Sequence, residues 1–77
     1  MNKERRKKLE ELMDSLTELK EEVESVKEEE EEAYENLPES FQESEKGETM
    51  NGFIDSLEDA VSNLEDAISN LETIINY

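Results

Sequence analysis

The sequence predicts an all-α protein: an antiparallel two-helix hairpin, coiled-coil-like, with a dimeric four-helix bundle as an open alternative. Three observations predict it. Apolar residues recur in alternating steps of three and four over residues 9–26, three heptads nearly repeat over residues 54–74, and Pro38 and Gly47 interrupt helical continuity between these stretches. A chain of 77 residues has room for a single domain, residues 1–77.

The first helix is expected from about residue 2 to residue 35. Asn2 can cap its N-terminus, and Glu4 and Lys8 are spaced for an i to i+4 ion pair in the favourable order. Its apolar residues would form one seam, meaning the rows of side chains that face the partner helix. The residues predicted for this seam are Leu9, Leu12, Leu16, Leu19, Val23 and Val26.

Residues 36–48 are expected to form the linker that reverses the chain. Pro38 disfavours helical backbone in the residue before it, and Gly47 weakens a helix that runs through it. Pro38 can also start a short helical turn that carries Phe41. Two helices of similar length can then lie side by side in opposite directions.

The second helix is expected from about residue 49 to residue 76. IDSLEDA, VSNLEDA and ISNLETI are successive heptads, so branched residues alternate with leucine along its seam. The seam residues predicted here are Met50, Ile54, Leu57, Val61, Leu64, Ile68, Leu71 and Ile75. Beside them runs a third apolar row of Phe53, Ala60, Ala67 and Ile74. A stripe this wide indicates more than one helix contact.

The charge pattern also favours the antiparallel arrangement. Five basic residues within residues 3–8 would lie beside Glu65, Asp66 and Glu72 near the end of the second helix. Residues 21–46, in contrast, hold 12 acidic side chains and 2 basic ones. The uncompensated negative charge should therefore gather toward the turn.

The composition argues against several functions. Because the chain has no Cys and no His, no nucleophile has a plausible activating base, and we expect no catalytic residue, no metal site and no cofactor. No apolar run is long enough for a membrane span. The net charge of -16 repels nucleic acid and anionic lipid, so we expect neither as a direct partner. High charge with low hydrophobicity also characterises disorder, so a disordered acidic tail stays an alternative.

The density of carboxylates indicates a basic protein as partner. About 45 Å of duplex DNA carries roughly 26 phosphates, and a hairpin of similar length would carry 24 carboxylates. We therefore expect mimicry of nucleic acid in the basic groove of a nucleic-acid-binding protein or nuclease. The acids predicted to bind it are Glu21, Glu24, Glu28, Glu31, Glu32, Glu35, Asp55, Glu58 and Asp59. The alternative is a structural or oligomerisation coiled-coil module, for example a homodimer, that binds through its apolar stripe.

The opening MNKERRKKLEEL, the segment AYENLPESFQESEKGETM and the stretch LEDAVSNLEDAISNLE together resemble short acidic helical proteins of Gram-positive bacteria and their phages and prophages. The similarity spans essentially the whole chain, and residues 36–47 are its distinctive part. It implies a helical hairpin in the cytoplasm of a bacterial host cell, with no catalytic residues. By analogy with small acidic phage inhibitors, it also implies an anti-defence role against a CRISPR or restriction nuclease.

Overall fold

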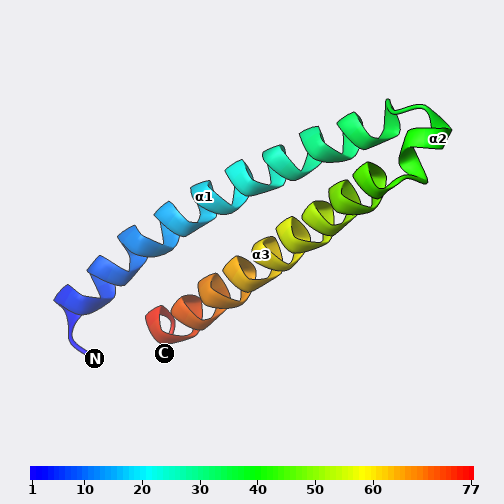
Figure 1. The fold of residues 1–77 in the computed structure, drawn as a ribbon. Coiled ribbons are helices and arrows are strands. Elements are labelled where there is room, and N and C mark those ends of the chain that lie inside the picture. Colours follow the sequence, from blue (N-terminus) through cyan, green and yellow to red (C-terminus); the bar gives the residue numbers. More distant parts are fainter.

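The computed structural model describes residues 1–77, and the prediction of an all-α chain is confirmed. α1 spans Lys3–Glu35, α2 spans Glu39–Gln42 and α3 spans Glu45–Ile75. α1 and α3 lie side by side in an extended rod whose Cα atoms span 58 × 14 × 13 Å. The two termini lie at one end of the rod and α2 lies at the other (Figure 1), so the long helices run in opposite directions.

The ends of α1 follow from local hydrogen bonding. The Asn2 side chain caps its start, because Oδ1 accepts a hydrogen bond of 2.8 Å from the backbone N–H of Arg5. No Gly or Pro interrupts the following 33 residues. The helix ends at Glu35, where the N–H of Asn36 donates to the carbonyl of Glu32 at 3.0 Å. Pro38, three residues after Glu35, prevents further helical continuation.

The turn is held by the side chain of Gln42. Its Nε2 donates to the carbonyls of Tyr34 and Leu37, both at 3.1 Å, and lies 3.5 Å from that of Glu35. The Tyr34 carbonyl also accepts from the N–H of Leu37 at 3.1 Å, whereas the helix supplies no donor to the carbonyls of Glu35 and Leu37. The short helix predicted after Pro38 is present as α2, and it positions Gln42 for this role.

The linker is shorter than the predicted residues 36–48, because α3 begins at Glu45 and contains Gly47. Gly47 is one of only two buried residues. A Cβ atom added to it would lie 2.0 Å from the backbone oxygen of Gln42. The expectation that Gly47 breaks the helix is therefore corrected: its lack of a side chain lets the end of α2 pack directly on the first turn of α3.

The core between the long helices is thin. Val61 is the one buried apolar residue, and the other α3 residues that face α1 are only half-buried. These half-buried residues are Met50, Ile54, Leu57, Leu64, Ile68, Leu71 and Ile75. A single helix contact covers only part of each side chain, so an extended pair of helices buries little.

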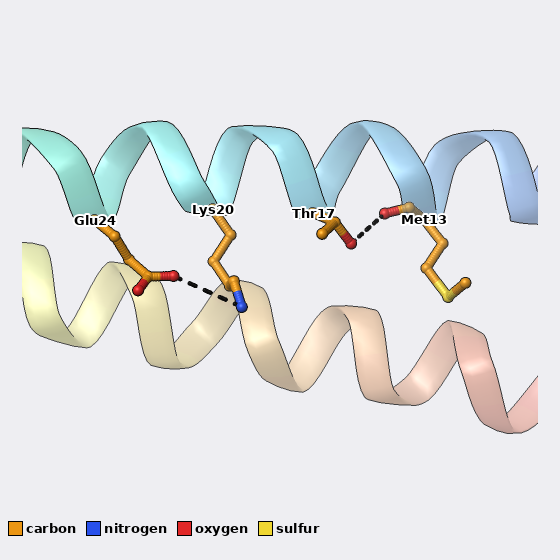
Figure 2. A network of polar contacts seen from close by, with 4 residues as sticks. All are labelled: Met13, Thr17, Lys20 and Glu24. Atoms are coloured by element: carbon orange, nitrogen blue, oxygen red, sulfur yellow. Dashed lines mark hydrogen bonds and ion pairs between the residues drawn. The ribbon is translucent and has the colours of Figure 1, made fainter.

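The structure corrects half of the seam predicted for α1. Leu9, Leu16 and Val23 are half-buried, whereas Leu12, Leu19 and Val26 are 47% to 52% exposed. The second row of the α1 seam is shifted by one residue. It consists of Arg6, Met13, Lys20, Lys27 and Tyr34, all half-buried. Figure 2 shows the Met13 and Lys20 side chains reaching toward α3.

The shift has a physical reason in the lysine side chains. Steps of three and four from Leu9 fit the row of Leu12 and the row of Met13 equally well. Lys20 can occupy the second row because its apolar stem lies against α3, leaving the side chain 25% exposed, while its Nζ lies 3.6 Å from Glu24 Oε1. Tyr34 belongs to the same row, and its backbone carbonyl accepts a hydrogen bond from Gln42 Nε2 at 3.1 Å.

Candidate functional site

Two apolar rows lie on the same side of the helix pair. The α1 row consists of the residues immediately before Met13, Lys20, Lys27 and Tyr34 of the seam, which are Leu12, Leu19, Val26 and Ala33. The α3 row consists of the residues immediately before Ile54, Val61, Ile68 and Ile75 of the seam, which are Phe53, Ala60, Ala67 and Ile74. In an antiparallel pair, a two-fold axis perpendicular to both helices relates one helix to the other. Residues at the same heptad position of the two helices therefore lie on the same side of the seam. We call these eight residues the apolar face.

The surface hollows at the chain ends agree with this arrangement. Ile74, from the apolar face, lines a hollow of about 310 Å³ with Met1 and Arg6. Lys3 and Glu10 come from the opposite flank of α1 and line a separate hollow with Ile75. The two flanks of the seam are therefore distinct surfaces.

The apolar face is largely open to solvent. Its five large members, which are Leu12, Leu19, Val26, Phe53 and Ile74, are 37% to 56% exposed. Ala33 is also exposed, while Ala60 and Ala67 are half-buried. Exposed apolar residues in one continuous patch, as opposed to scattered ones, mark interaction surfaces.

The nine acids predicted to bind a partner all lie away from the apolar face. Glu24, Glu31 and Glu58 flank the seam on the opposite side. The next row outward holds Glu21, Glu28, Glu35 and Asp55, and Glu32 and Asp59 point away from the partner helix. We call these nine residues the acidic face; none of them is buried.

Two members of the acidic face have a basic neighbour. Glu24 lies 3.6 Å from Lys20, and Glu31 lies 3.7 Å from Lys27. The predicted pair of Glu4 with Lys8 is not formed. The other seven acids of the face have no Lys or Arg nitrogen within 4.0 Å. Such half-exposed i to i+4 pairs contribute little stability, so most of the negative charge is unneutralised.

The charge is concentrated at the turn end of the rod. Residues 21–60 hold 16 acidic and 2 basic side chains, whereas residues 1–20 and 61–77 together hold 8 acidic and 6 basic ones. Glu28, Glu31, Glu32 and Glu35 line a shallow surface hollow of about 510 Å³ together with Asn36. One half of the rod is therefore strongly negative and the other half is nearly neutral.

The basic N-terminus is less tightly paired than the sequence suggested. No ion pair joins α1 to α3, so the expected attraction to Glu65, Asp66 and Glu72 forms no direct contact. Arg6 packs beside Thr73 and Ile74, and its Nε is buried with no hydrogen-bond acceptor. The cluster around Lys3 and Arg6 thus remains available for other acids.

The structure contains no group of acidic side chains arranged to hold a metal ion. None of its helices has the length and apolar content that a bilayer crossing requires. Sequence reasoning found the α3 row of the apolar face but missed its α1 row, because Leu12, Leu19 and Val26 were assigned to the seam. The signal that could have found it is the competing seven-residue repeat through Arg6, Met13, Lys20, Lys27 and Tyr34.

Comparison with known proteins gave no match to a protein family, to a curated protein or to a solved structure.

Proposed function

We propose that this protein is a non-enzymatic binding protein whose acidic face occupies the basic groove of a nucleic-acid-binding protein. In this proposal the fold is an antiparallel, coiled-coil-like hairpin that acts as a rigid carrier for the carboxylates. The observation that supports it most strongly is the charge of the turn half, with 16 acidic and 2 basic side chains in residues 21–60.

The spacing of the acids suits such a groove. Glu21, Glu24, Glu28, Glu31 and Glu35 follow one another along one side of α1, in steps of three and four residues. At a rise of about 1.5 Å per residue, one carboxylate occurs roughly every 5 Å of helix. One strand of DNA carries a phosphate about every 3.4 Å, so the helix presents a comparable line of charge.

The position of these acids does not serve the stability of α1. The last turn of the helix contains no basic residue, and acidic side chains at a helix C-terminus are repelled by the helix dipole. Glu28 and Glu32, and likewise Glu31 and Glu35, are like charges four residues apart, which destabilises a helix by about 0.2–0.5 kcal/mol per pair. A binding role accounts for charges that folding does not need.

The proposed partner is a nuclease of the CRISPR or restriction type, and the protein would act as a phage-type inhibitor in the cytoplasm of a bacterial host cell. The resemblance of the sequence to small acidic phage proteins supports this choice of partner. A protein that keeps DNA out of such a groove has to compete with duplex DNA for the same basic side chains.

Displacement of DNA tests the proposal. Fluorescent duplex DNA bound to a purified restriction nuclease, or to a guide-loaded CRISPR nuclease, is titrated with this protein at several salt concentrations. We expect displacement by the protein, with an affinity that falls at least about tenfold between about 50 and 200 mM salt because the ions screen exposed charges. Absence of displacement from both nucleases at low salt would refute the proposed partner class.

A matched pair of variants tests the surface. The first variant changes Glu28, Glu31, Glu32 and Glu35 to Gln, and the control changes Glu4, Glu10, Glu11 and Glu18 to Gln. Both remove four negative charges, but only the first alters the acidic face. We expect the first variant to lose at least about tenfold in displacement and the control to lose much less. Equal losses would show that net charge matters and the face does not.

A second candidate function is a structural or oligomerisation module that binds through the apolar face. The exposure of Leu12, Leu19, Val26, Phe53 and Ile74 supports it. Substituting these residues should then abolish assembly, while the Glu to Gln changes on the acidic face should leave it intact.

A further inference from the structure

The apolar face has no partner within the chain. Only Val61 and Gly47 are buried, and the chain has no Cys to form a disulfide. Chains of this size gain little from burial while still losing the conformational entropy of every ordered residue. An additional helix contact on the open side of the rod would bury the large apolar residues that α1 and α3 leave exposed.

We propose that a second copy of this chain packs on the apolar face, with the two rods in opposite directions. The turn end of each copy then lies beside the terminal end of the other, and four helices form one bundle. This inference names the partner for the second candidate function. It is independent of the acidic face, which remains on the outside of the bundle.

The size of the face fits this occupant. One side of the rod, 58 Å long and 14 Å wide between Cα atoms, measures about 800 Å² in all, and the apolar face forms the middle of that side. A stable protein–protein interface buries about 800 Å² on each partner. The face occupies the middle of the rod, where each of its rows, from Leu12 to Ala33 and from Phe53 to Ile74, extends over about 32 Å of helix. A partner of the same length covers it completely.

The three large α1 residues of the face and its α3 row are nearly symmetric about one level of the rod, whereas Ala33 lies outside this symmetry, beside Arg5 of the second copy. Leu19 stands midway between Leu12 and Val26, and the midpoint of the α3 row lies between Ala60 and Ala67. Arg6 and Ile75 line one hollow and so lie at the same level of the rod. Thirteen residues toward the turn from Arg6 in α1 and from Ile75 in α3, Leu19 is level with Ser62. Ser62 lies close to the midpoint of the α3 row. One two-fold axis through this level therefore serves both rows.

This axis brings residues of matching size and polarity together. Leu19 meets Leu19 of the second copy, and Leu12 meets Val26 of the second copy. On α3, Ala60 meets Ala67 of the second copy, which lets the backbones approach closely. The next row outward on α3 is Thr49, Ser56, Asn63, Asn70 and Tyr77, so no charge lies at that edge of the contact.

Charge selects the opposed direction of the rods. With both turns at the same end, two segments of 16 acidic and 2 basic side chains would lie side by side. In the opposed direction, each turn half lies beside the nearly neutral terminal half of the other copy. Lys8 and Glu29 occupy the same outer row of α1, and the two-fold axis places each beside the other residue of the second copy.

Mass in solution tests the assembly. By sedimentation at micromolar concentration we expect a species of twice the 9.0 kDa chain mass. Leu19→Glu should raise the dissociation constant at least about 100-fold, because it buries two like charges at the two-fold axis. Ser25→Glu adds the same charge on the exposed side of α1 away from α3 and should leave the dimer intact. A monomeric wild-type chain, or equal effects of the two variants, would overturn the proposal.

Cysteine cross-linking tests the direction, since the natural chain has no Cys. Under mild oxidation, Leu19→Cys should form a disulfide-linked dimer, because position 19 lies on the axis. Val26→Cys should not, since the two copies of position 26 are about 14 residues, or roughly 21 Å, apart along α1, far beyond disulfide reach. Val26→Cys should instead cross-link to Leu12→Cys when the two variants are mixed. Self-cross-linking of Val26→Cys without that of Leu19→Cys would overturn the opposed direction.

Charge exchange gives an independent readout. Lys8→Glu and Glu29→Lys should each weaken the dimer severalfold, because each places like charges together, and the double variant should regain wild-type affinity. Additive losses would overturn the proposed contact between Lys8 and Glu29. A chain that is monomeric yet still displaces DNA would remove the dimer and leave the acidic binding function standing.

Discussion

The two glycines of α3 should respond in opposite ways to the same substitution. Gly47→Ala adds a Cβ atom 2.0 Å from the backbone oxygen of Gln42, whereas Gly52→Ala adds one with no atom within 4 Å. Ordinary van der Waals contact begins at 3.4 Å, so the end of α2 has to move away from α3. Both variants gain about 1 kcal/mol of helix propensity, which makes Gly52→Ala a matched control.

The magnitude follows from the contacts that are lost. Forcing a side chain into a packed site costs about 1–3 kcal/mol, and displacing Gln42 weakens its bonds to Tyr34 and Leu37, at about 1 kcal/mol each. After the gain in propensity, we expect Gly47→Ala to reduce the free energy of unfolding by about 2–4 kcal/mol. At roughly 4–8 °C per kcal/mol for a domain of this size, its Tm should fall by about 10–30 °C.

Thermal unfolding followed by far-UV circular dichroism, at one fixed protein concentration, measures both variants. Gly52→Ala should raise the Tm by about 5 °C while Gly47→Ala lowers it. A rise of similar size in both variants would refute the close packing of α2 on α3.

Three further predictions concern single side chains. Gln42→Ala should lower the free energy of unfolding by about 1–2 kcal/mol in urea titrations, because it leaves the Leu37 carbonyl without a donor and removes one of the two donors to the Tyr34 carbonyl; no loss would show that water replaces the amide. Asn2→Ala should cost about 1 kcal/mol through the lost cap to Arg5, and Asn2→Asp should retain stability; a neutral Asn2→Ala would mean that the end of α1 frays. Lys20→Met should stabilise the fold by about 0.5–1 kcal/mol, because an apolar side chain replaces a lysine stem in the seam, while Lys46→Met at an exposed position should change little. Equal effects at Lys20 and Lys46 would place Lys20 outside the seam.

The two surfaces of the rod are compatible with one another. The apolar face and the acidic face lie on opposite flanks of the seam, so pairing through the first leaves the second exposed. In the proposed dimer the two acidic turn halves lie at opposite ends of the bundle. Each end could then engage a separate basic groove, and the dimer would bind two partner molecules.

Much of the secondary structure follows directly from the sequence. Asn2 marks the start of α1, Pro38 marks the turn, and the heptads from Ile54 define the face of α3. These signals are local, because caps, proline geometry and seven-residue periodicity act within a few residues. The start of α3 was misplaced, since a glycine near a helix end looks like a breaker until its neighbour in space is known.

The rotation of α1 could not be predicted from the sequence. The row of Leu12, Leu19 and Val26 is more apolar than the row of Met13, Lys20 and Lys27, and yet the second row faces α3. Hydrophobicity ranks residue types, but a lysine stem buried with its ammonium group beside a carboxylate behaves as an apolar residue. Periodicity fits the row of Leu12 and the row of Met13 equally well. A choice between them by hydrophobicity therefore places the wrong row against α3.

By itself, the sequence determined that this chain is helical, that it reverses near Pro38, and that its negative charge gathers in residues 21–60. Only the tertiary structure decided which flank of the pair is apolar and which is acidic. The reason is that a side chain's place on its own helix depends on local periodicity, whereas its burial depends on how the two helices are rotated against each other. That rotation depends on contacts between α1 and α3, whose residues lie far apart in the sequence, so no local pattern relates them.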